Sequence, residues 1–97
     1  MIKRISELTE TDKKKYFEKT KEEMSKYGKP WEFYEEKMQE FLDAAFDDEL
    51  FPKMSPNDQI DAAYIRKDFG KNKPSIIEYL LWQGKFVTHS DYVEVPD

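Results

Sequence analysis

Apolar residues recur every three or four positions along most of the chain, which predicts helices separated by short breaks. Thr9 or Thr11 can cap a first helix, and Asp12 favours its N-terminus. One face of this helix carries Tyr16, Phe17, Thr20, Met24 and Tyr27. Gly28 can end the helix, and Pro30 suits the first turn of the next one. The short link between them predicts adjacent, roughly antiparallel helices.

The second helix has two contrasting sides. Its predicted buried stripe consists of Trp31, Tyr34, Met38, Phe41, Leu42, Ala45 and Phe46. The opposite side carries carboxylates at the same spacing: Glu32, Glu36, Glu40, Asp43 and Asp47. Pro52 then breaks the helix.

Ser55, Pro56 and Asp58 together predict the start of a third helix, with Ser55 as its cap and Gly70 as its stop. Its expected inner face consists of Ile60, Ala63, Tyr64 and Phe69. Residues 75–83 are apolar almost all round, which predicts a central fourth helix that Gly84 closes.

The two ends of the chain differ from the helical region 10–84 between them. Residues 1–9 are expected to be a lead-in whose apolar residues dock on the domain. Residues 85–97 are expected to be an extended tail. In it, 86–88 and 92–95 can form a hairpin, or the tail can lie extended over the bundle. The sequence therefore predicts one all-α domain, residues 1–97, of four to five helices.

Composition agrees with a small folded domain. Hydrophobic residues make up 38% of the chain, which is low, but aromatic residues make up 15%, and each one buries a large apolar area. There is no cysteine, so disulfides and thiolate metal sites are excluded. The chain contains no apolar run of the roughly 20 residues that a membrane span requires. Its first residues lack the apolar segment of a secretion signal, and we expect a cytoplasmic protein.

The net charge of −5 is concentrated in the second helix. Residues 31–51 contain eight acidic residues and one lysine, whereas residues 1–30 have a net charge of +3. Carboxylates three or four positions apart lie about 5–6 Å from one another on a helix, which resembles a row of phosphates. The acidic side, Glu32, Glu36, Glu40, Asp43 and Asp47, is therefore the candidate interaction face. The simpler interpretation is a solvated face that keeps the protein soluble.

One stretch has an order of residues that is similar to a known family. It reads Phe41, Ala44, Ala45, Phe46, Asp48, Phe51, Pro52, Lys53 and Ser55. This run resembles the YozE SAM-like (sterile-alpha-motif-like) family of small helical bacterial proteins. Tyr64-Ile65 and Trp82 resemble residues of its later helices, and Tyr16-Phe17, Lys26-Tyr27 and Pro30 resemble its opening part. The resemblance covers residues 16 to 82 and implies a SAM-like bundle. It implies a fold but no activity, since the members of the family are largely uncharacterised. SAM-like bundles in general are mostly protein-interaction modules, and a few bind RNA.

Candidate catalytic and metal-binding groups are few. His89, the only histidine, lies in a polar tail without an evident partner for acid–base catalysis. The carboxylates lack the Glu-x-x-His spacing of a di-iron bundle and the glycine turn of a calcium loop. The three glycines occur as helix stops and form no phosphate-binding loop. We therefore expect no enzyme, no metal site and no cofactor.

Three functions remain open from the sequence. The first is a non-enzymatic cytoplasmic module that binds a protein partner. The second is an acidic inhibitor that occupies a nucleic-acid-binding surface through its phosphate-like helix face. The third is a winged helix, with residues 75–83 as recognition helix and the 86–95 hairpin as wing. That helix contains no arginine and the domain is acidic, so we do not expect direct nucleic-acid binding.

Overall fold

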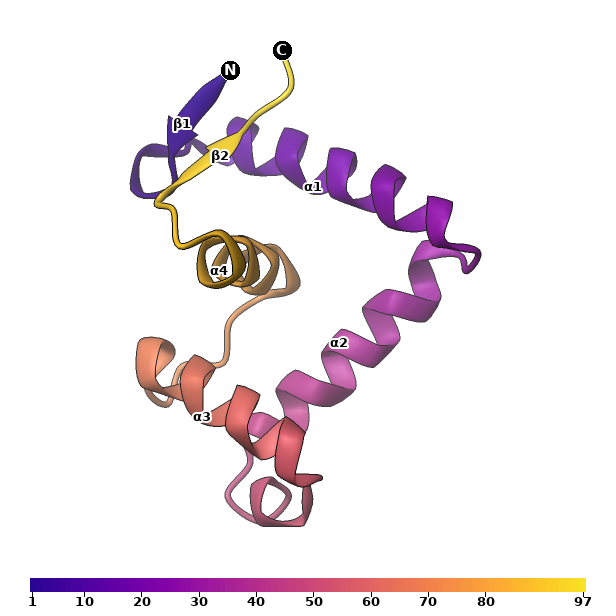
Figure 1. Cartoon of the computed structure of the whole chain (residues 1–97), viewed down its shortest axis with the longest axis vertical. Coiled ribbons are helices and arrows are strands. Elements are labelled where there is room, and N and C mark those ends of the chain that lie inside the picture. The colour runs from indigo at the N-terminus through magenta and orange to yellow at the C-terminus, as the bar shows by residue number, and fades with distance from the viewer.

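Helix α4 (Ile76–Thr88) lies between α1 (Glu10–Met24) and α3 (Pro56–Phe69) and opposite α2 (Trp31–Ala45) (Figure 1). The computed structural model describes the whole chain, residues 1–97. Three short 3₁₀ segments complete the helical part: η1 (Ile5–Glu7), η2 (Ser25–Tyr27) and η3 (Phe51–Lys53). The predicted all-α bundle with a central fourth helix is confirmed.

The starts of α1 and α3 have the cap residues that the sequence predicts. In each of three helices, the hydroxyl of the cap residue accepts a hydrogen bond from the backbone N–H three positions later. The pairs are Thr9 with Asp12, Ser55 with Asp58 and Ser75 with Glu78. These bonds satisfy donors that have no partner within the helix. Of the two candidate caps of α1, Thr9 is the one used.

Helices α1 and α2 meet at an elbow instead of lying antiparallel. Gly28 ends η2 with a φ of 93°, a left-handed conformation that favours glycine. Pro30 then adopts an extended conformation as the cap of α2. The two helices diverge from this point as an open V (Figure 1). The antiparallel prediction is wrong because α4 contacts both helices and lies between them. Tyr27 is also 80% exposed, because the helix tightens to 3₁₀ before reaching it.

Gly84 does not close α4, contrary to the prediction. The helix continues to Thr88, and His89 ends it in a left-handed conformation with a φ of 55°. A Cβ atom on Gly84 would lie 3.3 Å from the Tyr16 hydroxyl, so glycine at this position lets α1 approach α4 closely. Residues 86–88 therefore belong to α4, and the predicted hairpin is wrong. Without this hairpin, the winged-helix interpretation has no wing.

The two ends of the chain pair with each other. Strand β1 (Ile2–Arg4) is antiparallel to β2 (Tyr92–Glu94), with Lys3 opposite Val93. The alternative prediction, an extended tail over residues 85–97, is correct only after His89, because residues 85–88 belong to α4 and residues 92–94 form a strand with β1. Figure 1 shows both termini side by side above α4.

Helix α3 turns a different face inward from the one that we expect. Ala62 and Ile65 are fully buried, whereas Ile60 is 56% exposed and Tyr64 50% exposed. Both faces of α3 are apolar, so periodicity alone does not determine which one packs inward. Phe69 belongs to the inner face, as predicted.

Few residues are fully removed from solvent. The molecule measures 42 × 30 × 21 Å, and ten of its 97 residues are buried. The buried apolar residues are Trp31, Leu42, Ala45, Ala62, Ile65, Leu80, Leu81 and Val95. In such a flat molecule most aromatic rings are only half-buried, so they contribute apolar area to the surface.

Candidate interaction surfaces

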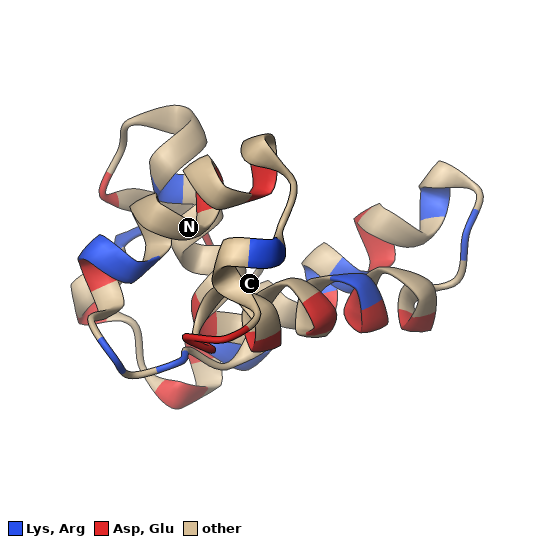
Figure 2. Cartoon of the chain, turned by 90° about the horizontal axis from the view of Figure 1, so that it is seen from below, with Lys and Arg blue, Asp and Glu red and all other residues tan.

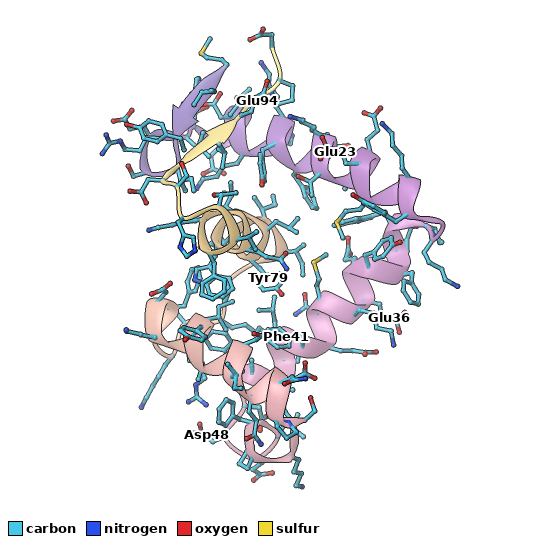
Figure 3. All side chains as sticks on the ribbon, viewed as in Figure 1. Glu23, Glu36, Phe41, Asp48, Tyr79 and Glu94 are labelled. Atoms are coloured by element: carbon cyan, nitrogen blue, oxygen red, sulfur yellow. The ribbon has the colours of Figure 1, made fainter.

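The acidic side of α2 is exposed as the sequence predicts, but its five carboxylates are not equivalent. Glu32, Glu36 and Glu40 lie along the helix and line a shallow groove of about 380 Å³. Figure 3 shows Glu36 on the outer side of α2. Glu40 has a loose ion pair with Lys37, at 3.9 Å. These three carboxylates are therefore available to a partner.

The other two predicted members of the face have partners inside the protein. Asp43 accepts from the Lys73 ammonium at 2.7 Å and from the Gln39 amide at 3.0 Å. These bonds, first that from Lys73 and then that from Gln39, hold the pKa of Asp43 below its usual range.

Asp47 lies beyond the end of α2, so its place on the helix face is a wrong prediction. It accepts from the backbone N–H groups of Glu49 and Leu50 and organises the turn before η3. The helix ends at Ala45, two residues before the carboxylate that the regular spacing placed on its surface.

A row of aromatic rings fills the space between α3 and α4. The rings follow one another as Phe41, Tyr79, Trp82, Phe86 and Tyr64, with centroids 5.2 to 6.2 Å apart. Figure 3 shows Phe41 and Tyr79 entering this space from α2 and α4. Burial, with a smaller contribution from the Asp61 and Asp58 charges, raises the pKa of the Tyr79 phenol. Phe41 and Tyr79 are both half-buried, so this end of the row is more enclosed than the other.

The other end of the row reaches the surface. Tyr64 and Phe86 are in ring contact and are 50% and 43% exposed, and Ile60 lies one turn before Tyr64 on the same side of α3. We call Ile60, Tyr64, Trp82 and Phe86 the aromatic surface. Sequence reasoning missed it, because it assigned Ile60 and Tyr64 to the core. The signal that could have revealed it is the second apolar face of α3.

A groove runs along α4 beside the aromatic surface. One part, of about 420 Å³, has an apolar floor of Ile5, Phe69, Leu81 and Trp82. The adjoining part, of about 310 Å³, includes Phe86, His89 and Asp91. Asp68, Trp82 and Lys85 line both parts. The indole Nε1 of Trp82 donates to Asp68 at 2.6 Å, which fixes this carboxylate beside the rings.

The structure contains neither a cluster of metal-ligating side chains nor a helix that could span a membrane. No three His, Asp or Glu side chains come together in an arrangement that could hold a metal ion. Every helix is too short or too polar to cross a bilayer. His89 is exposed at the end of α4 and makes no side-chain hydrogen bond.

Comparison with known proteins adds no assignment. No family profile matches the chain, and no curated protein or solved structure is significantly similar to it. The resemblance to the YozE SAM-like family therefore stays a prediction, and function has to be argued from the surfaces themselves.

Proposed function

We propose that this chain is a non-enzymatic protein-interaction module that binds its partner through the aromatic surface of α3 and α4. The observation that carries the proposal is the exposure of Ile60, Tyr64 and Phe86 beside one another. Contiguous exposed apolar side chains mark interaction sites, because covering them gains about 25 cal/mol per Å². Aromatic residues are also enriched at protein interfaces.

The chemistry of the remaining surface supports binding over catalysis. Acidic and basic residues occur on most parts of the ribbon (Figure 2), and most of their ion pairs are exposed. His89 has no partner that would position it as a general base. The proposal also agrees with the SAM-like resemblance, which implies an interaction role. As part of the same proposal, we infer that the protein acts in the cytoplasm.

The second candidate function is the acidic inhibitor that occupies a nucleic-acid-binding surface. The observation that favours it is the line of three available carboxylates, Glu32, Glu36 and Glu40, on one side of α2. The line is shorter than the sequence suggests, because Asp43 and Asp47 are engaged elsewhere. For this reason the aromatic surface is the stronger candidate.

Affinity capture with matched variants separates the two functions. The wild-type protein, a Tyr64→Ser/Phe86→Ser variant and a Glu32→Gln/Glu36→Gln/Glu40→Gln variant are immobilised and exposed to lysate of the source cells. Circular dichroism first establishes that all three are folded. If the interaction-module proposal is correct, wild type and the glutamine variant should both capture the same partner protein. The serine variant should fail to capture it.

The acidic inhibitor predicts the reverse pattern. The glutamine variant would lose the partner, and added DNA would displace the partner from wild type. If wild type retains nothing beyond what an unrelated protein of equal net charge retains, the module proposal is wrong.

A further inference from the structure

We infer that the groove beside α4 receives an arginine side chain from a basic segment of the protein partner. This inference rests on the proposed function and adds the chemistry of the partner to it. It follows from three properties of the groove: its floor, its carboxylates and its lysines.

The floor and the aromatic surface provide apolar contact. Leu81 and Trp82 belong to the floor, and Phe86 continues it into the adjoining part. The Trp82 and Phe86 rings are nearly parallel, 14° apart, with centroids at 5.2 Å. A planar guanidinium with a long aliphatic stem suits such a site, because it can lie against aromatic rings while its stem covers apolar surface.

Two carboxylates at the groove lack a cationic partner. Asp68 accepts only the indole N–H of Trp82, so one of its oxygens stays free. Glu78 accepts only from Ser75, within the cap of α4. A carboxylate with a free oxygen beside an apolar floor favours a cation that can donate several hydrogen bonds.

The two lysines of the groove already have anionic partners of their own. Lys85 lies 3.2 Å from Asp91, and Lys13 lies 3.6 Å from Glu10. Neither forms an ion pair with Asp68 or Glu78. The residues that line the two parts of the groove carry three carboxylates, Asp68, Glu78 and Asp91, and two ammonium groups, Lys13 and Lys85, so the net charge of the groove is −1.

This charge selects among the possible occupants. A nucleic acid or an anionic lipid surface would meet both free carboxylates and a chain of net charge −5. A second copy of the chain has the same net charge, and its two arginines, Arg4 and Arg66, already bond to Tyr92 and Asp48. A basic segment of a partner protein is the occupant that complements the groove in charge and in its apolar floor.

The two tryptophans provide a built-in test. Trp31 donates its indole N–H to Glu35 at 2.6 Å near the elbow, as Trp82 does to Asp68 at the groove. Their two indole N–H signals can be followed together by NMR. The probe is a capped synthetic peptide of alternating arginine and leucine, and two further peptides carry lysine or glutamine in place of arginine.

We expect the arginine peptide to shift the Trp82 indole signal saturably and to leave the Trp31 signal unchanged. The lysine peptide should bind several-fold more weakly, and the glutamine peptide should not bind. Asp68→Asn should weaken binding of the arginine peptide about tenfold, because it removes the charge and keeps an acceptor for the indole. The matched control, Glu35→Gln, should bind like wild type.

Several results would overturn the inference. Equal shifts of both indole signals, or equal weakening by Asp68→Asn and Glu35→Gln, would indicate unspecific attraction to an acidic protein. Equal affinity for the lysine and arginine peptides would remove the preference for guanidinium. Should Asp68→Asn fail to fold, Glu78→Gln replaces it, and unchanged affinity in that variant counts against the inference.

The capture experiment distinguishes this inference from the proposed function. If no peptide shifts Trp82 while the Tyr64→Ser/Phe86→Ser variant still loses its captured partner, the arginine inference fails and the module proposal stands.

Discussion

Lys3 in β1 donates to both carboxylate oxygens of Asp12 in the first turn of α1, each at 3.0 Å. The same carboxylate accepts from the backbone N–H of Thr9 at 3.1 Å. Asp12 is thus the point at which the strand, the helix cap and the helix are held together. The Thr9 N–H and then the Lys3 ammonium hold the pKa of Asp12 below its usual range.

Asp12→Asn should lower the melting temperature, because it removes the charge that binds Lys3. A lowered pKa in the folded state stabilises the fold above the ordinary carboxyl value of about 3.8, and this stabilisation is lost as pH falls through the lowered pKa. The difference in melting temperature between wild type and variant should therefore be constant from about pH 7 to 5 and shrink below about pH 4.

The control for this prediction is Glu10→Gln in the same turn. Glu10 is almost fully exposed and pairs with Lys13 only loosely, at 3.6 Å. The melting temperature of Glu10→Gln should fall by less than that of Asp12→Asn, because only the exposed charge near the helix N-terminus is lost. A pH-independent difference for Asp12→Asn would mean that the carboxylate charge does not stabilise this junction.

The second prediction compares two isoleucines on opposite faces of α3. Ile65 is fully buried, whereas Ile60 is 56% exposed. Ile65→Ala should cost about 2–5 kcal/mol, because it leaves a cavity, and Ile60→Ala should cost less than about 1 kcal/mol. Urea denaturation measures both. Similar costs for the two variants would show that the inner face of α3 is assigned incorrectly.

The third prediction concerns the cap of α3. Ser55→Ala should cost about 0.5–2 kcal/mol, because the Ser55 hydroxyl accepts the Asp58 N–H at 3.3 Å. Ser55→Asp should keep most of this stability, since a carboxylate caps a helix as well as a hydroxyl does. Equal losses in the two variants, measured by chemical denaturation, would argue against the capping role.

Local signals in the sequence predict the helices well. Ser55 and Ser75 cap their helices because the required hydrogen bond spans only three residues. Gly28 adopts the left-handed conformation that its place after a helix predicts. Each of these depends on neighbours in the sequence, so a pattern of a few residues contains the necessary information.

What the sequence does not predict depends on distant contacts. Lys3 pairs with Val93 across ninety positions, and no local pattern indicates this pairing. The sequence alone predicts Gly84 to be a helix stop, whereas in the fold it gives room for Tyr16 of α1. The sequence does not predict the aromatic surface for the same reason: packing against α2 determines which face of α3 turns inward.

The last prediction tests the acidic side of α2 as a binding face. Glu32→Gln/Glu36→Gln/Glu40→Gln should leave the free energy of unfolding within about 0.5 kcal/mol of wild type, because exposed like charges contribute little to stability. If the acidic inhibitor is correct, the variant should lose its captured partner, and wild-type binding should weaken steeply between low and physiological salt.

A second triple variant controls for net charge. This variant, Glu7→Gln/Glu18→Gln/Glu22→Gln, removes the same number of negative charges from exposed positions outside α2. If both triple variants weaken capture equally, the total charge of the protein matters and the line on α2 does not. If the α2 variant binds as wild type does at every salt concentration, the acidic side is a solvated surface. Recognition then has to depend on the aromatic surface, where Tyr64 and Phe86 remain exposed.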